Sequence, residues 1–93
     1  MTIISKFYLK DPDAVLDYGF DWSPWLADGV TISASTWTVP AGITKDSDSN
    51  TTTTTTIVLS GGTAGVSYVL TNHVVASDGQ EDDRSMQVDV RER

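Results

Sequence analysis

Apolar and polar side chains alternate over residues 66–76, which is the longest strand-like pattern in the chain. A second alternation covers residues 84–91, and turn-forming residues separate the two. The patterns therefore predict an antiparallel β-hairpin with one apolar face. The side chains of that face that we assign to the protein core are Tyr68, Leu70, Met86 and Val88.

The register of these two strands predicts the length of the turn between them. A two-residue loop would place Leu70 opposite Gln87, whereas a three-residue loop of residues 77–79 places Leu70 opposite Met86. Only the longer loop pairs apolar with apolar side chains. Its third residue, Gly79, can adopt the left-handed conformation that such a loop needs. We therefore predict a three-residue loop.

Four further strands are predicted ahead of the hairpin, over residues 15–22, 30–39, 43–46 and 51–60. The core side chains assigned to them are Leu16, Tyr18, Phe20, Trp22, Trp37 and Leu59. Ala34 and Trp37 fall on opposite faces of their strand, so we predict a β-bulge near residues 35–36. Threonine is β-branched and suits a strand, and burial should increase from the threonine run 51–56 toward Leu59.

Proline and glycine mark the connections between these strands. Pro40 and Gly42 predict a second hairpin, in which Val39 faces Ile43. The glycine-rich residues 61–65 are expected to carry the chain from one sheet to the other.

Residues 45–50 are polar and predict a solvated loop. The spacing of Asp46, Asp48 and Asn50 is similar to the start of a calcium-binding loop. The glycine at the sixth position and the glutamate at the twelfth are missing, however. We therefore assign no metal site here.

Residues 1–10 precede these strands and end shortly before Pro12, which biases the chain away from helix. We treat residues 1–10 as an N-terminal arm or edge strand and residues 11–93 as one domain. The arm either forms the first strand of the domain or docks on a partner protein. In the second case its contacts would come from Ile3, Ile4, Phe7, Tyr8 and Leu9, with added positive charge from Lys6 and Lys10.

Composition excludes several classes of function. Thirteen acidic and six basic residues give a net charge of −7, which repels phosphate backbones and argues against a nucleic-acid partner. The chain has no cysteine, so neither disulfides nor thiolate metal sites are expected. It carries no signal-peptide pattern and no apolar run long enough to span a membrane.

The single histidine is the first candidate for a catalytic base. The predicted register sets His73 opposite Asp83, with Thr71 beside Ser85. This resembles a catalytic triad, but the residues lie on an open sheet face without a nucleophile elbow or an oxyanion hole. We interpret the pair as a cross-strand charge contact and assign no catalytic, cofactor-binding or metal-binding residue.

Six strands, or seven with the arm, predict an all-β protein with an immunoglobulin-like antiparallel β-sandwich. Trp37 lies where such domains place a core tryptophan, and Tyr68 lies where they place a tyrosine corner. In the loop after the first core strand, Trp25 either folds over the core or serves as an exposed binding aromatic.

The sequence resembles the small virion proteins of tailed bacteriophages known as fibre-tail adaptors. The motifs that carry the resemblance are KDPDAVLDY at 10–18, Asp21-Trp22, Trp25-Leu26, SGGTAG at 60–65 with Tyr68, Thr71-Asn72, Asp83-Arg84-Ser85 and the terminal VRER at 90–93. The resemblance implies a non-enzymatic structural module of the virion, made in the host cytoplasm.

Its implied partners are other virion proteins of the tail, neck, fibre or capsid, bound in several symmetric copies. Capsid decoration and, from another class, carbohydrate binding through Trp25 are the alternative functions.

Overall fold

The computed structural model describes residues 4–92, and within this range it contains seven β-strands and no helix. The strands are β1 (Ile4–Lys10), β2 (Leu16–Asp21), β3 (Ile32–Thr38), β4 (Ile43–Asn50), β5 (Thr54–Gly61), β6 (Ser67–Ala76) and β7 (Glu81–Val90).

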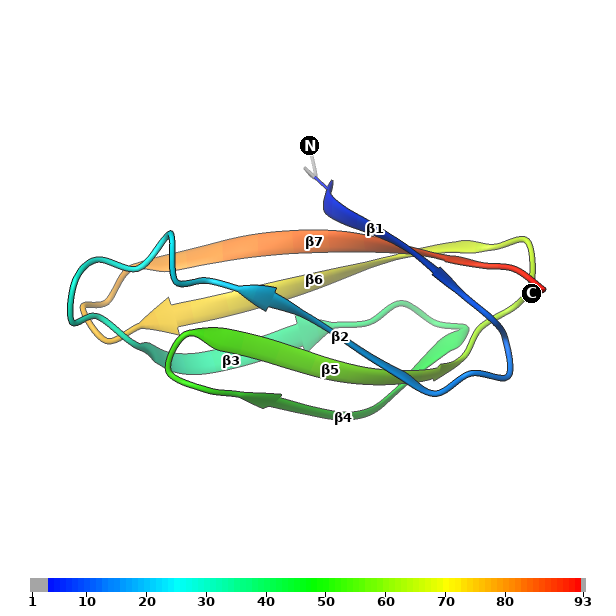
Figure 1. Ribbon diagram of the computed structural model, residues 1–93, viewed down its shortest axis with the longest axis horizontal. Coiled ribbons are helices and arrows are strands. Elements are labelled where there is room, and N and C mark those ends of the chain that lie inside the picture. The colour runs from blue at the N-terminus through cyan, green and yellow to red at the C-terminus, as the bar shows by residue number, and fades with distance from the viewer. Residues whose placement is uncertain (1–3, 93) are drawn as a thin grey trace.

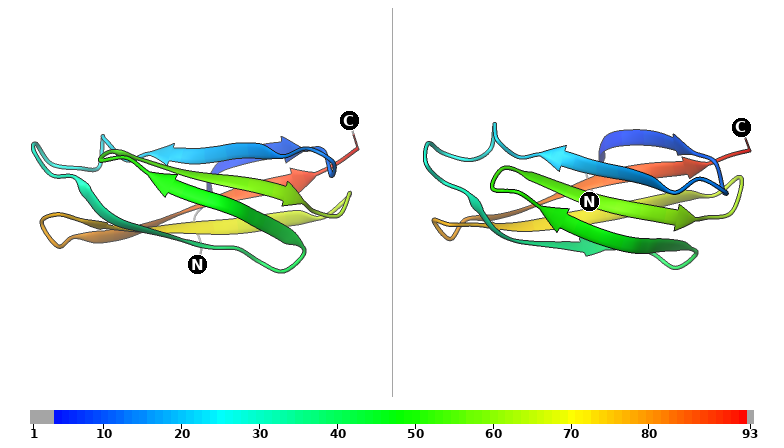
Figure 2. Two further views of the ribbon diagram at one scale, coloured as in Figure 1. Left: turned by 90° about the horizontal axis from the view of Figure 1, so that it is seen from below. Right: turned by 60° about the horizontal axis from the view of Figure 1, so that its bottom comes forward.

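The strands form two packed sheets, with the orders β1-β7-β6-β3 and β2-β5-β4 (Figures 1 and 2). All paired strands are antiparallel except β1, which runs parallel to β7. The segregation of β3, β6 and β7 from β2, β4 and β5 matches that of strands C, F and G from B, D and E in immunoglobulin domains. The predicted immunoglobulin-like sandwich is therefore confirmed.

The strands run along a molecule that measures 43 × 27 × 19 Å, so its turns gather at two opposite ends (Figure 1). One end, which we call the tip, holds the connections 22–31, 51–53 and 77–80. The other end, which we call the glycine-rich end, holds the connections 11–15, 39–42 and 62–66.

The hairpin of β6 and β7 has the predicted register, with Tyr68 opposite Val88 and Leu70 opposite Met86. Its loop has three residues, because the Ala76 amide donates to the Gln80 carbonyl at 2.8 Å. Gly79 has a φ of 91°, as the loop requires. The three-residue loop is confirmed.

The second predicted hairpin is wrong. β3 pairs with β6 in one sheet and β4 pairs with β5 in the other, so residues 39–42 carry the chain between the sheets. The predicted left-handed conformation of Gly42 is present, since its φ is 101°. The Tyr68 ring leaves little room for a side chain at this position, because a Cβ on Gly42 would lie 3.0 Å from that ring.

The predicted bulge in β3 is misplaced by about two residues. The register with β6 shifts between Ile32 and Ala34, ahead of the predicted residues 35–36. This shift lets Ile32 and Trp37 both face the core while Ala34 is exposed.

The predicted polar loop at 45–50 is also wrong, because these residues continue β4 along the edge of the three-stranded sheet. From Thr44 onward every residue of β4 is exposed, so the strand shows no apolar alternation. A register shift between Lys45 and Ser47 and several charges protect this edge from pairing with other chains. The threonine run splits into a turn over 51–53 and the start of β5, along which burial deepens toward Leu59 as expected.

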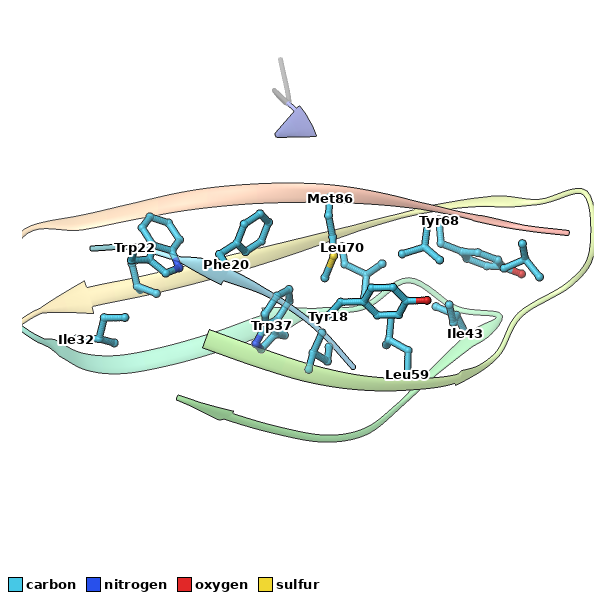
Figure 3. Close-up of a cluster of buried hydrophobic side chains, with 14 residues drawn as sticks. Tyr18, Phe20, Trp22, Ile32, Trp37, Ile43, Leu59, Tyr68, Leu70 and Met86 are labelled. Atoms are coloured by element: carbon cyan, nitrogen blue, oxygen red, sulfur yellow. The ribbon is translucent and has the colours of Figure 1, made fainter. Parts of the chain in front are cut away.

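The core lies between the two sheets and extends along the whole molecule (Figure 3). The assigned residues Tyr18, Phe20, Trp22, Trp37, Leu59, Tyr68, Leu70, Met86 and Val88 are buried in it. Leu16 is not, because it begins an edge strand at the glycine-rich end and is 40% exposed. Buried apolar residues that the sequence analysis left out are Ile32, Ile43, Ile57, Val74 and Val90.

Polar side chains hold the connection from β5 to β6 and the packing of the two sheets. The Tyr68 hydroxyl accepts a hydrogen bond of 2.9 Å from the Thr63 amide, which is the arrangement of a tyrosine corner. The fully buried Asn72 carboxamide accepts from Trp22 Nε1 at 3.0 Å and from Thr55 Oγ1 at 2.6 Å. Since Asn72 lies on β6 and Thr55 on β5, the second contact joins the two sheets.

Candidate interaction surface

The N-terminal residues 4–10 form the edge strand β1, paired in parallel with β7 over Ile4–Lys10. Phe7 and Leu9 point outward from this strand and are 65% and 50% exposed. Tyr8 points the other way and packs on Tyr18, with ring centroids 4.7 Å apart. Among the other arm residues, Ile4 is half-buried, and Ile3 lies outside the described residues.

The two lysines of β1 are turned inward. Lys6 Nζ donates to the Gly19 carbonyl at 3.2 Å and lies 5.5 Å from the centre of the Phe20 ring. Lys10 is fully buried, and its Nζ donates to the Gly61 carbonyl at 2.7 Å and to the Asp11 carbonyl at 2.9 Å. Burial lowers the pKa of Lys10, against the opposing effect of nearby carboxylates. The positive charge expected on the arm is therefore engaged within the domain.

The outward side chains of β1 continue across the sheet in two rows. The first row is Phe7, Gln87 and Val69, and the second is Leu9, Asp89 and Ser67. The Asp89 carboxylate accepts from Ser67 Oγ at 2.5 Å and from Gln87 Nε2 at 2.9 Å. These hydrogen bonds hold the pKa of Asp89 below its usual value, so it is ionised at neutral pH.

All six large apolar side chains that are exposed in the described part of the chain lie toward the glycine-rich end. They are Phe7, Leu9, Val15, Leu16, Val66 and Val69. Phe7, Leu9 and Val69 lie on the outer face of the four-stranded sheet, whereas Val15 and Val66 lie in the connections at that end. Three of the six exposed apolar side chains therefore share one sheet face, and all six lie in one half of the molecule.

Negative charge is concentrated at the tip, away from the exposed apolar side chains. The tip half (residues 20–36, 48–56 and 73–84) carries seven carboxylates and one arginine, which gives −6. The glycine-rich half, made up of the other described residues, carries six carboxylates and four basic side chains, which gives −2. The exposed apolar side chains therefore lie in the half with the smaller net charge.

His73 and Asp83 lie opposite one another on the outer face of β6 and β7, as predicted. Both imidazole nitrogens face carboxylates, Nδ1 toward Asp83 at 2.5 Å and Nε2 toward Glu81 at 2.8 Å. These hydrogen bonds raise the pKa of His73 above its usual value. Thr71 Oγ1 is 2.8 Å from Ser85 Oγ and contacts its neighbour rather than the histidine. Across residues 4–92, no three His, Cys, Asp or Glu side chains are grouped to hold a metal ion.

Trp25 is half-buried and folds over the core at the tip. Its ring meets that of Trp22 edge to face, with centroids 5.3 Å apart. The amide of Trp25 donates to the Trp22 carbonyl at 2.9 Å, which closes the loop around Pro24. The position supports the interpretation of Trp25 as a packing residue.

Comparison with known proteins identifies the family of this two-ended sandwich. The sequence matches the family described as "Podophage GP4 fiber-tail adaptor protein gp77" over residues 10–89. The chain belongs to this family. The match covers β2 to β6 and all of β7 except its last residue, whereas Phe7 and Leu9 precede it.

A solved structure similar to this adaptor-family protein is "Solution structure of the PKD domain from KIAA 1837 protein". The TM-score is 0.53 with 21% sequence identity, and the match covers 100% of this chain and 85% of the other. At this identity the similarity supports the fold alone. No curated protein matches the sequence. In residues 4–92 no helix is long and apolar enough to cross a membrane.

Proposed function

We propose that this protein is a non-enzymatic component of the bacteriophage virion that connects tail-fibre, tail or neck proteins, and that it docks through the outward face of β1. The observation that carries the proposal is the exposure of Phe7 and Leu9 on an edge strand, in a member of a fibre-tail adaptor family. Docking needs no release of an arm, because β1 presents these side chains while it stays paired with β7.

The energetics favour these two residues as the centre of a contact. Full burial of a Phe or Leu side chain stabilises an interface by about 1.5–3 kcal/mol. Interfaces concentrate their energy in a few such anchors surrounded by polar side chains. Gln87 and Asp89, beside Phe7 and Leu9 on β7, would supply that polar surround.

The absence of enzymatic activity and of a required cofactor is part of the proposal. Its support is the surface position of His73, whose two nitrogens face Asp83 and Glu81 and so are not directed at a substrate. The net charge of −7 supports protein partners over nucleic acid. We expect synthesis in the host cytoplasm and several symmetric copies per particle.

Density for this chain in the intact particle tests the proposal. We expect it at the tail, the neck or the fibre attachment site. Density on the capsid faces would overturn the adaptor role in favour of capsid decoration. Glycan-array binding that Trp25→Ala abolishes would overturn it in favour of a carbohydrate-binding module.

A further inference from the structure

The sandwich has four edge strands, and their chemistry differs. β2 and β4 carry carboxylates on their edges, at Asp17 and Asp21 and at Asp46 and Asp48. β3 is uncharged and exposes only small or hydroxyl side chains outside the core. β1 alone combines the absence of a carboxylate with large exposed apolar side chains. β1 is therefore the edge that presents the most apolar side-chain surface, and its two lysines are its only charges.

We propose that two copies of this chain pair antiparallel through β1 about a two-fold axis, with Phe7 of one copy opposite Leu9 of the other. β7 is the only strand paired with β1 among residues 4–92, so one edge of β1 has no strand neighbour. A two-fold axis makes the same strand supply both sides of the contact. This inference rests on the proposed use of β1 as the docking surface, and it identifies a second copy of the chain as the protein that binds there.

The register follows from the geometry of β1. Its pairing with β7 shifts between Ile4 and Lys6, so the regular part of the strand begins at Lys6 and ends at Lys10. An axis at Tyr8, the middle of this segment, sets Phe7 opposite Leu9 in both halves of the contact. Phe7 and Leu9 of both copies then form one cluster of four apolar side chains on a single sheet face. An axis at Phe7 would instead pair Phe7 with Phe7 and set Leu9 opposite Ser5, which leaves one apolar pair in place of two.

Charge does not oppose this pairing. Lys6 and Lys10 would face each other across the axis, but their ammonium groups donate to the carbonyls of Gly19, Gly61 and Asp11 in their own domain. Antiparallel strands also point the two domains in opposite directions. The tip halves, each with a charge of −6, would therefore lie at the far ends of the dimer.

Sedimentation equilibrium on the full chain tests the pairing. We expect reversible dimers in the unmodified protein over about 1 μM to 1 mM. Phe7→Asp should weaken the dimer at least about tenfold, since it removes two phenylalanines from the apolar cluster and adds two charges. Val15→Asp, at a comparably exposed site outside β1, should leave it within about twofold. A protein that stays monomeric at 1 mM, or equal effects of the two variants, would overturn the pairing.

Cysteine crosslinking tests the register, because the chain has no native cysteine. We expect the double variant Phe7→Cys/Leu9→Cys to form disulfide-linked dimers at least about tenfold faster than either single variant. Faster crosslinking of Phe7→Cys alone would overturn the register. If the protein is monomeric and yet Phe7→Asp prevents entry into the virion, the pairing fails while the proposed adaptor role stands.

Discussion

Replacement of Asn72 by alanine should destabilise the domain by about 1–3 kcal/mol, although Asn72 is polar. Its carboxamide is fully buried, and all of its hydrogen-bonding capacity is used. Besides the contacts of its oxygen, Asn72 Nδ2 donates to Ser35 Oγ and to the Thr36 carbonyl, each at 3.0 Å. One side chain thus connects β6 to β3, to β5 and to the end of β2.

The magnitude follows from the groups that the substitution leaves behind. The buried Thr55 hydroxyl loses its acceptor on Asn72, whereas Trp22 Nε1 keeps Thr55 Oγ1 as a second acceptor at 3.2 Å. A buried donor left without its acceptor costs about 1–3 kcal/mol, which gives the value above. A domain of this kind has only about 5–15 kcal/mol in total, so the loss is a large fraction of its stability.

Urea unfolding measures this loss. For a slope of about 1–1.5 kcal/mol per M, the midpoint should fall by roughly 0.7–3 M. Asn50→Ala is the matched control, because Asn50 is exposed and its Nδ2 bonds only to the carbonyl of Thr51. The control should stay within about 0.5 kcal/mol of the unmodified protein. A midpoint for Asn72→Ala that coincides with the control would refute the buried network as a source of stability.

Three further outcomes can be measured in the same way. The folded state raises the pKa of His73, so its stabilising contribution is complete below the unfolded value of 6.5 and is lost as the pH rises through the folded value. His73→Ala should therefore cost under about 1 kcal/mol, and more at pH 5.5 than at pH 8.5; an NMR titration that gives a pKa below 6.5 would contradict this. Tyr68→Phe removes the acceptor of the Thr63 amide and should cost about 0.5–1.5 kcal/mol by urea unfolding, because Thr63 is exposed and its amide can bind water; no change would remove the tyrosine corner from the account. Trp37→Ala, which removes a ring stacked on Phe20, should cost about 3–5 kcal/mol; an unchanged midpoint would show that this ring contributes little to the core.

The strands with one buried face could be predicted from the sequence. In β6 and β7 a strict two-residue period fixes which side chains point inward, and matching Leu70 with Met86 fixes the register. The tyrosine corner could be anticipated too, because Tyr68 follows the glycine-rich crossing. β4 could not, because an edge strand exposed on both faces needs no apolar period.

The pairing of β3 with β6 could not be predicted from the sequence, for a different reason. Turn chemistry at Pro40 and Gly42 reverses the chain equally well within a sheet and between sheets. The choice of β6 as partner depends on contacts some 35 residues away along the chain, such as that of Asn72 with Ser35. Local sequence carries no record of such contacts.

The arm was ambiguous because both of its faces mix residue types. Phe7 and Leu9 share one face, whereas Tyr8 shares the other with Lys6 and Lys10. Apolarity alone would bury the first face, but the structure buries the second. It can do so because the carbonyls of distant residues accept the lysine hydrogen bonds.

The most direct test of docking through the outward face of β1 is the content of phage particles assembled with Phe7→Asp/Leu9→Asp. Both side chains are exposed, so this variant should remain folded, with a cost of about 0.2–1 kcal/mol from the new carboxylate at residue 9 beside Asp89. Ser49→Asp, on the exposed edge strand of the other sheet, is the control and should enter particles normally. We expect particles that lack the double variant, or in which its amount falls at least about tenfold relative to the control. A folded double variant present at the same copy number as the control would contradict the account.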